Sequence, residues 1–266
     1  MNFFQGCTAL ITGASSGIGA ELARQLAPDA KVLILVARRL DRLEALRAEL
    51  ARPSLTIHIH LTDLTDETQT ASLLQTLAAS GEKITLLINC AGLGDHGLFE
   101  KSAEFRVREM LEVNVKALTQ ITQAIIPSMV RNAHGAVLNV SSIAALLPIP
   151  KLAVYAATKA YVNSFSEALR GELRGTGVSV TTLCPGPVDT EFFGNAVRLD
   201  SSESMPSPRI FKVHVQTVAK AGLKAVRRDH ARAIPGWFVC TVMNITSLIP
   251  IFFLRLGFGL GRRKHP

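Results

Sequence analysis

The chain has 266 residues, of which 48% are hydrophobic and 19% charged, a composition that supports a large core and excludes an intrinsically disordered protein. The formal net charge is +8, but residues 205–266 alone hold eleven lysines and arginines against one acid, Asp229. A localised basic region can meet a membrane surface, a nucleic acid or an acidic substrate, or it can be a solvated face. No nucleic-acid-binding motif is recognisable, so we expect no nucleic-acid partner.

The cysteines and histidines predict neither disulfides nor a metal site. His58, His60 and His134 show no metal-ligand spacing with nearby acids. The cysteines lie far apart, and three of them fall in apolar runs where a buried, reduced thiol is the usual state; they are Cys7, Cys90, Cys184 and Cys240. The first residues, "MNFFQGCTALITG", lack the charged segment of a secretion signal. We therefore expect a cytoplasmic protein, with membrane association of its C-terminal end as an alternative.

Short apolar runs alternate with amphipathic segments along most of the chain. The apolar runs predict strands at 7–13, 31–37, 54–60, 85–91, 135–142, 178–186 and, as a last short strand, 231–236. The amphipathic segments predict helices at 17–27, 40–51, 66–79, 103–131, 153–174 and about 213–228. This alternation implies right-handed crossovers and a parallel sheet covered on both faces. The prediction is one α/β domain, a Rossmann-type doubly wound parallel sheet of about seven strands.

The catalytic domain is predicted to span residues 1–236. Residues 190–210 are rich in serine, proline and small residues and predict a mobile loop, so that residues 190–228 form a substrate loop and helix. The remaining residues, 237–266, form an apolar C-terminal extension with a basic end.

The apolar part of this extension, residues 237–254, carries no charge and is just long enough to span a bilayer. However, Pro250 interrupts it, and Thr241, Asn244 and Ser247 recur every three residues as a narrow polar stripe. A helix lying in the membrane interface, with basic residues at the lipid head groups, fits at least as well. Packing over the substrate cleft or in a subunit contact is the third alternative.

The stretch "LITGASSGIGA" (10–20) places three glycines between the first expected strand and the first expected helix. Gly13 lets the chain turn tightly, Gly17 removes a Cβ where a pyrophosphate would approach, and Gly19 permits close packing of the helix. The free N–H groups and the dipole of a helix N-terminus attract phosphate. A tight turn without any ligand gives the same spacing, but its place in the first βαβ unit favours dinucleotide binding.

The spacing T-G-x-x-x-G-x-G, with the motifs that follow it, resembles the short-chain dehydrogenase/reductase family. Matching motifs occur in order over about two thirds of the chain: "TGASSGIG" (12–19), "LTDLTD" (61–66), "NCAG" (89–92), "EVNV" (112–115), "VSSIAALLPIPKLAVYAATKA" (140–160) and "CPGPVDT" (184–190). The resemblance implies cofactor contacts at Gly13, Ser15, Ser16, Gly17, Ile18, Gly19, Asp63, Leu64, Asn89, Ala91, Gly92, Tyr155, Lys159, Pro185, Gly186, Val188 and Thr190.

The end of the second expected strand indicates which nicotinamide cofactor is bound. In a dinucleotide fold this position meets the adenosine ribose, and an acid there favours the free 2′-hydroxyl of NAD. Here Ala37 is followed by Arg38 and Arg39, whose guanidinium groups suit a 2′-phosphate. The alternative is that one arginine pairs with an acid of the next helix, Asp41 or Glu44. We predict NADP(H) rather than NAD(H).

Tyr155 and Lys159 form a Y-x-x-x-K pattern, which places both side chains on one face of a helix. A nearby cation, together with the charge of oxidised nicotinamide, favours the phenolate and so lowers the pKa of the phenol. The resemblance implies that Ser142, thirteen residues before Tyr155, is catalytic, although Ser141 is adjacent. It also implies that Asn114 holds a helix irregularity and a water that links Lys159 to solvent. Ser142 and Tyr155 are the predicted substrate contacts.

These residues predict hydride transfer between NADP(H) and a carbonyl or secondary alcohol. Phe192, Phe193 and the C-terminal extension favour an apolar substrate, and a 3-oxoacyl thioester, a steroid-like ketone and a retinoid-like aldehyde all remain open. The basic C-terminal region slightly favours a phosphate-bearing acyl carrier. The rival hypothesis is a non-catalytic, nucleotide-binding regulatory or membrane-associated scaffold protein.

The sequence departs from the family pattern at two places. Cys90 replaces the second asparagine of N-N-A-G, and the apolar extension replaces a glycine-rich C-terminal ending. The second departure leaves the substrate pocket and the oligomer geometry open. The resemblance implies a homodimer or homotetramer built on the helices at 103–131 and 153–174.

Overall fold

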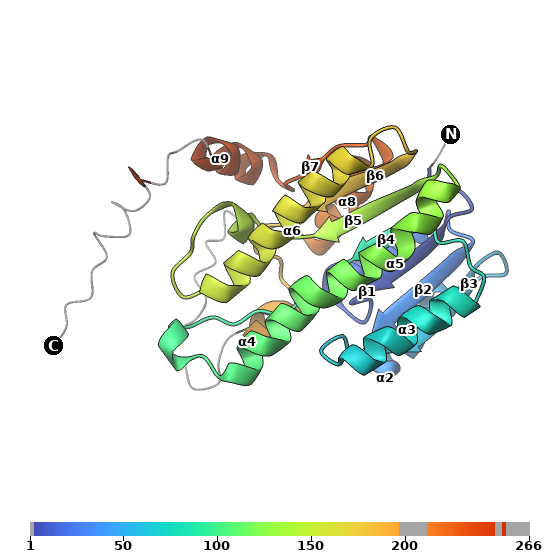
Figure 1. Cartoon of the computed structure of the whole chain (residues 1–266), viewed down its shortest axis with the longest axis horizontal. Helices are drawn as coiled ribbons and strands as arrows, with labels where there is room; N and C mark the ends of the chain where they lie inside the picture. Colours follow the sequence, from blue (N-terminus) through green and yellow to red (C-terminus); the bar gives the residue numbers. More distant parts are fainter. Residues whose placement is uncertain (1–2, 197–211, 248–251, 254–266) are drawn as a thin grey trace.

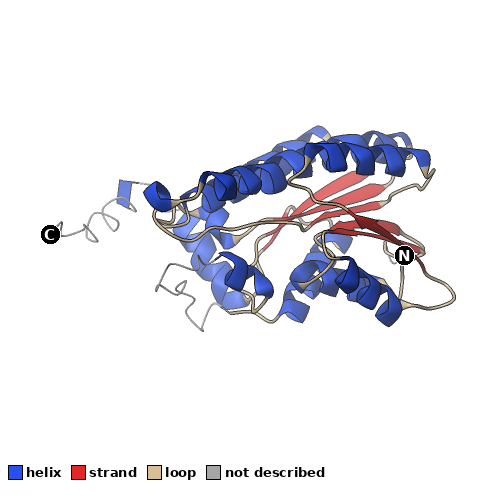
Figure 2. Ribbon diagram, turned by 90° about the horizontal axis from the view of Figure 1, so that it is seen from below, coloured by secondary structure: helices blue, strands red, loops and turns tan. Residues whose placement is uncertain are grey.

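Runs of aliphatic residues form a parallel sheet whose central strands are buried along their whole length. A computed structural model describes residues 3–196, 212–247 and 252–253, and its strands are β1 (Thr8–Thr12), β2 (Val32–Ala37), β3 (Thr56–Leu61), β4 (Leu86–Asn89), β5 (Gly135–Val140), β6 (Val178–Leu183) and β7 (Arg232–Ala233). They pair in the order β3-β2-β1-β4-β5-β6-β7. Continuous apolar strands form because helices cover both faces of the sheet, as Figure 2 shows.

The helices form one layer on each face of the sheet (Figure 1). They are α1 (Gly17–Leu26), α2 (Leu40–Leu50), α3 (Glu67–Ala79), α4 (Glu104–Leu111), α5 (Leu118–Arg131), α6 (Ala153–Glu172), α7 (Glu191–Ala196), α8 (Val215–Arg227) and α9 (Trp237–Ser247). One apolar core gathers the inner faces of α1, α2 and α8 against the sheet. A second core gathers those of α3 and α5 on the opposite face. The predicted doubly wound Rossmann-type fold is confirmed.

Three elements differ from the sequence prediction. The helix expected over 103–131 is divided into α4 and α5 by a π-helical turn, η2 (Glu112–Ala117). Residues 190–210 were predicted as a loop, but the short helix α7 occupies their first part, and residues 197–211 lie outside the described part of the chain. The last strand is shorter than the predicted 231–236, because β7 covers only Arg232–Ala233. It pairs with the end of β6 at two positions and ends shortly before Pro235 and Gly236.

The C-terminal extension begins with α9, which packs against the body of the molecule on one side only. Val239 and Met243 are buried with 2% and 7% exposure, one helical turn apart, whereas Trp237 is 83% exposed. Among the described residues, no helix is both long and apolar enough to cross a bilayer. The membrane-spanning helix, one of the alternatives for residues 237–254, is therefore not found among the residues of this segment that the structure describes.

Candidate active site

A cavity of about 1120 Å³ opens at the carboxyl edge of the sheet. It lies where the strand order changes direction, because the chain adds β2 and β3 on one side of β1 and then returns to place β4 on the other. Open α/β sheets bind ligands at this crevice. The cavity is lined by the turn before α1, the ends of β2 and β5, the segments that follow β4 and β6, the start of α6, and α7.

The glycine-rich turn between β1 and α1 adopts the conformations that its spacing predicts. Gly13 has a φ of +69°, and a Cβ there would lie 2.8 Å from Cα of Ala91. A Cβ at Gly19 would collide with the carbonyl oxygen of Gly13, so α1 packs directly on the turn. Gly17 has a φ of +55° and lies against Thr190, since a Cβ at Gly17 would lie 3.2 Å from Cγ2 of Thr190.

The N-terminus of α1 fits a phosphate group. Ser16, its N-cap residue, makes no side-chain cap hydrogen bond within the described chain. The first N–H groups of a helix have no intrahelical acceptor, and here they lie beside a glycine turn that lines the cavity. This cradle and the size of the cavity fit a dinucleotide cofactor.

The ribose corner, formed by Arg38 and Arg39 at the end of β2, carries half-exposed charges at the cavity wall. Arg38 approaches Asp63 with an N–O distance of 3.7 Å. Arg39 forms a 2.7 Å ion pair with Glu191 of α7 and donates to Ser15 Oγ at 3.4 Å. Arg39 therefore pairs with an acid, but with Glu191 rather than with Asp41 or Glu44 of the next helix.

Tyr155 and Ser142 meet at the opposite end of the cavity. Ser142 follows β5 and caps a 3-10 turn, η3 (Ile143–Leu146), by accepting a hydrogen bond from Ala144 N at 3.1 Å. Tyr155 lies in the first turn of α6. Burial raises the pKa of Tyr155 to about 12, and its hydrogen bond with Ser142 acts in the opposite direction. The lowered pKa predicted for this phenol includes the charge of oxidised nicotinamide; among the protein's own groups, burial dominates and raises the pKa.

Ser141 faces away from this pair. Its hydroxyl donates to the carbonyl oxygen of Lys159 at 3.0 Å and so joins β5 to the middle of α6. Ser142 is therefore the serine whose hydroxyl meets Tyr155.

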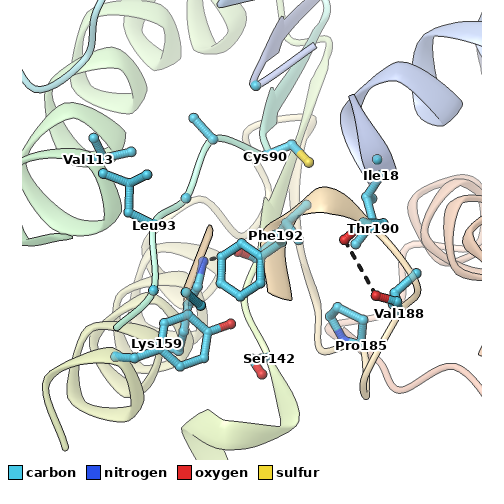
Figure 3. Close-up of a pocket in the computed structure, with 18 of the residues that line it drawn as sticks. Ile18, Cys90, Leu93, Val113, Ser142, Lys159, Pro185, Val188, Thr190 and Phe192 are labelled. Carbon is cyan, nitrogen blue, oxygen red and sulfur yellow. Dashed lines mark hydrogen bonds between the residues drawn. The ribbon is translucent and has the colours of Figure 1, made fainter. Parts of the chain in front are cut away.

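Lys159 is buried one helical turn beyond Tyr155, with only 4% of its surface exposed. Its ammonium donates to the carbonyl of Val140 at 2.9 Å and lies 5.9 Å from the centre of the Tyr155 ring. Burial lowers the pKa of Lys159 to about 8. Gly92 leaves room for it, since a Cβ there would lie 3.2 Å from Nζ. Figure 3 shows Lys159 beside the cavity, with Phe192 projecting into the same space.

Asn114 lies in the π-helical turn η2, where the sequence analysis expected a helix irregularity. Its Oδ1 accepts from Leu93 N at 2.8 Å, and its Nδ2 donates to Leu93 O at 2.9 Å and to Thr158 Oγ1 at 3.0 Å. The side chain is fully buried. It thus fastens the segment after β4 to α6 and shapes the cavity without lining it.

Most predicted cofactor contacts line the cavity. They are Gly13, Ser15, Ser16, Gly17, Ile18, Arg38, Arg39, Asp63, Leu64, Ala91, Gly92, Tyr155, Lys159, Pro185, Gly186, Val188 and Thr190. Gly19 and Asn89 do not. Asn89 points into the core, where its Nδ2 donates to Thr122 at 2.9 Å and to Asn139 at 2.8 Å. These hydrogen bonds to α5 and β5 fix the end of β4 from the side of the core, not from the cavity.

The apolar wall at the catalytic end was not predicted from the sequence. It is formed by Leu93, Ile143, Ile149, Leu152 and Met243. Three of these residues lie between Ser142 and Tyr155, and this position in the chain is a signal that could have suggested them, because both ends of that segment are at the cavity. Met243 lies in the segment 237–254, for which packing over the substrate cleft was one of three alternatives, but the sequence did not single out this residue.

The comparisons with known proteins agree with this geometry. A family model described as short chain dehydrogenase matches residues 7–199. The sulfoacetaldehyde reductase of Chromohalobacter salexigens is 40% identical over 187 residues, covering 68% of this chain and 72% of that protein. The very-long-chain 3-oxoacyl-CoA reductase of Rattus norvegicus is 26% identical over 271 aligned positions, covering 97% and 81%.

Two solved structures cover nearly the whole chain. A short-chain dehydrogenase from Sphingobium yanoikuyae in complex with NADPH has a TM-score of 0.77 and 30% identity, with 98% of both chains covered. A short-chain dehydrogenase/reductase from Burkholderia phymatum in complex with NAD has a TM-score of 0.81 with 100% and 99% covered, and its 23% identity shows the fold alone. This chain belongs to the short-chain dehydrogenase/reductase family and is an oxidoreductase that uses a nicotinamide cofactor.

Proposed function

We propose that the chain is an NADP(H)-dependent reductase. Its substrates would be ketones or aldehydes that are largely apolar apart from the carbonyl group. The observation that carries this proposal is that one cavity has Ser142, Tyr155 and Lys159 at one end and Arg38 and Arg39 at the other. A cavity of about 1120 Å³ can hold a dinucleotide and a substrate together.

The cofactor would be held along the carboxyl edge of the sheet. The turn at Gly13–Gly17 would hold the pyrophosphate, Asp63 the adenine and Arg38 and Arg39 the 2′-phosphate. Leu64, Ala91 and Gly92 would line the adenosine side, and Pro185, Gly186, Val188 and Thr190 the nicotinamide. NADP(H) supplies the hydride chemistry at C4 of its nicotinamide.

Tyr155 would donate a proton to the substrate oxygen during reduction, and Ser142 would hold that oxygen by a hydrogen bond. Burial raises the pKa of Tyr155 to about 12, so the phenol carries its proton at neutral pH before the cofactor binds. The charge of oxidised nicotinamide would lower this pKa and so assist proton transfer. Lys159 would contact the nicotinamide ribose, and its positive charge would favour the phenolate form of Tyr155 and so lower the pKa of the phenol. Asn114 would hold Leu93 and α6 in register rather than contact the substrate.

An apolar substrate is supported by the apolar wall defined above (Leu93, Ile143, Ile149, Leu152 and Met243) and by Phe192, which also lines the cavity. We propose a catalytic domain formed by residues 1–236 and a C-terminal extension formed by residues 237–266. Since Met243 comes from α9, the described start of this extension would cover the substrate end of the cavity. Peripheral membrane contact of the extension stays a prediction.

We further propose a homodimer or homotetramer. Exposed apolar side chains of α4, Phe105 at 52% and Leu111 at 47%, support an interface on this side of the molecule.

A substrate panel tests the proposed function. Purified protein would be assayed for NADPH oxidation with an aryl ketone, a 3-oxoacyl thioester, a steroid ketone and a small sulfonated aldehyde. We expect the bulky apolar carbonyls to give the higher kcat/KM. Turnover of the sulfonated aldehyde alone would contradict the apolar substrate, and NADPH binding with no turnover of any carbonyl would favour the regulatory or scaffold alternative.

A further inference from the structure

The three residues Thr190, Glu191 and Phe192 connect both ends of the cavity. Thr190 lies against Gly17 of the glycine-rich turn. Phe192 packs on Tyr155 with 5.6 Å between the ring centres. Glu191, between them, pairs with the ribose corner.

The Glu191 carboxylate is held by two arginines. One oxygen accepts from Arg39 Nη1 at 2.7 Å, and the other from Arg42 Nη2 at 3.4 Å. The same Arg39 guanidinium reaches Ser15 Oγ of the glycine-rich turn at 3.4 Å. Arg39 and Glu191 both line the cavity, whereas Arg42 does not. The carboxylate therefore holds an arginine of the ribose corner from inside the cavity wall.

A carboxylate and a phosphate compete for the same donors of a guanidinium group, because both accept its forked hydrogen bonds. A 2′-phosphate beside Arg39 would also be repelled by the negative charge of Glu191. The 2′-hydroxyl of NADH is neutral and carries no such penalty.

We propose that Glu191 is a cofactor-specificity residue that occupies the Arg39 guanidinium in place of the 2′-phosphate and so lowers the preference for NADPH over NADH. This inference rests on the proposed binding of the 2′-phosphate at Arg38 and Arg39. When NADPH binds, the Glu191–Arg39 pair opens or shares its donors. When NADH binds, the pair stays closed.

The test is titration of the wild type and Glu191→Gln with NADPH, with NADH, and with the fragments adenosine 2′,5′-bisphosphate and adenosine 5′-monophosphate. The variant keeps the shape of the side chain and removes its charge. We expect about two- to fivefold tighter binding of NADPH and of the bisphosphate, the range of an exposed ion pair, with NADH and the monophosphate unchanged.

Asp189→Asn is the matched control. Asp189 lies two residues earlier and pairs with Lys212 at 2.7 Å, without lining the cavity. The Asp189→Asn substitution removes one negative charge from the same segment. We expect it to leave the ratio of the dissociation constants of NADPH and NADH unchanged. Thermal unfolding of both variants checks that the fold is kept.

Each outcome decides the inference. If Glu191→Gln leaves NADPH affinity unchanged or weakens it, or if Asp189→Asn tightens NADPH binding equally, Glu191 is not a competitor of the phosphate. Failure of the proposed function appears separately: a wild type that binds NADPH no better than NADH, with no loss in Arg39→Gln, would show that the corner does not bind a 2′-phosphate at all.

Discussion

The catalytic end of the cavity and the ribose corner are built in different ways. Lys159 and Asn114 are 4% and 0% exposed, and their polar atoms are held by the backbone of Val140 and Leu93. In contrast, the side chains of Arg38 and Arg39 are 52% and 40% exposed and are held by ion pairs with other side chains.

This difference teaches where each property of the enzyme resides. Buried groups with backbone partners cannot change their positions without disturbing the fold, so under the proposed function this end of the cavity would determine the reaction. Exposed ion pairs contribute little to stability and exchange partners easily, so the proposed 2′-phosphate site could be altered to favour one cofactor or the other.

The largest expected effect comes from removing the Tyr155 hydroxyl. Tyr155→Phe keeps the ring that packs on Phe192 but removes the proton donor, so kcat should fall by about 10²- to 10⁴-fold. NADPH affinity should change little. Steady-state kinetics and a cofactor titration give both values. Tyr161→Phe, on an exposed part of the same helix, is the control, and an equal loss there would contradict the assignment.

The next effect concerns the glycine-rich turn, the proposed pyrophosphate site. Gly13→Ala combines a positive φ with a Cβ that would lie 2.8 Å from the backbone of Ala91, so it should lower the free energy of unfolding by about 2–4 kcal/mol. Gly81 has a similar φ of +71° but open space around it, so Gly81→Ala should cost only about 1 kcal/mol. Urea unfolding of the two variants measures the difference. Equal costs would mean that the approach to Ala91 is unimportant.

A pH-dependent effect follows from the burial of Lys159. Its pKa is lowered from 10.5 to about 8, so between these values the unfolded state binds more protons and stability rises with pH. The free energy of unfolding of the cofactor-free wild type, relative to Lys159→Met, should therefore increase by about 2 kcal/mol from pH 8 to pH 10. Urea unfolding over this range tests the slope. A constant or falling difference would show that Lys159 keeps its charge in the folded protein.

The smallest effect is at the ribose corner. Arg39→Gln removes one guanidinium from the proposed phosphate site and should weaken NADPH binding about tenfold, with NADH unaffected. Fluorescence titration with both cofactors measures this. Arg42→Gln is the control, because Arg42 also pairs with Glu191 but does not line the cavity. This variant should keep its preference for NADPH over NADH. Equal losses for both cofactors would mean that Arg39 contacts a part that they share.

The fold, and the meeting of Ser142, Tyr155 and Lys159 in one cavity, could be predicted from the sequence because both depend on local patterns. Continuous apolar runs identify buried parallel strands, and the spacing from Ser142 to Tyr155 and Lys159 brings strand end and helix together. The partner of Arg39 could not be predicted, because Glu191 lies 152 positions away and meets it only through the folded chain. The low pKa of Lys159 likewise depends on tertiary burial beside Val140 and Gly92.

The most direct test of the account follows the hydride itself. NADPH with deuterium in both C4 positions of the nicotinamide would be incubated with the protein and a bulky apolar ketone, and the alcohol analysed by mass spectrometry and NMR. We expect one deuterium on the carbinol carbon of the alcohol formed by the wild type, and at least about 100-fold less alcohol in the same time with Tyr155→Phe at equal cofactor occupancy. An alcohol without deuterium on that carbon, or equal amounts of labelled alcohol from the two proteins, would contradict the proposed reaction.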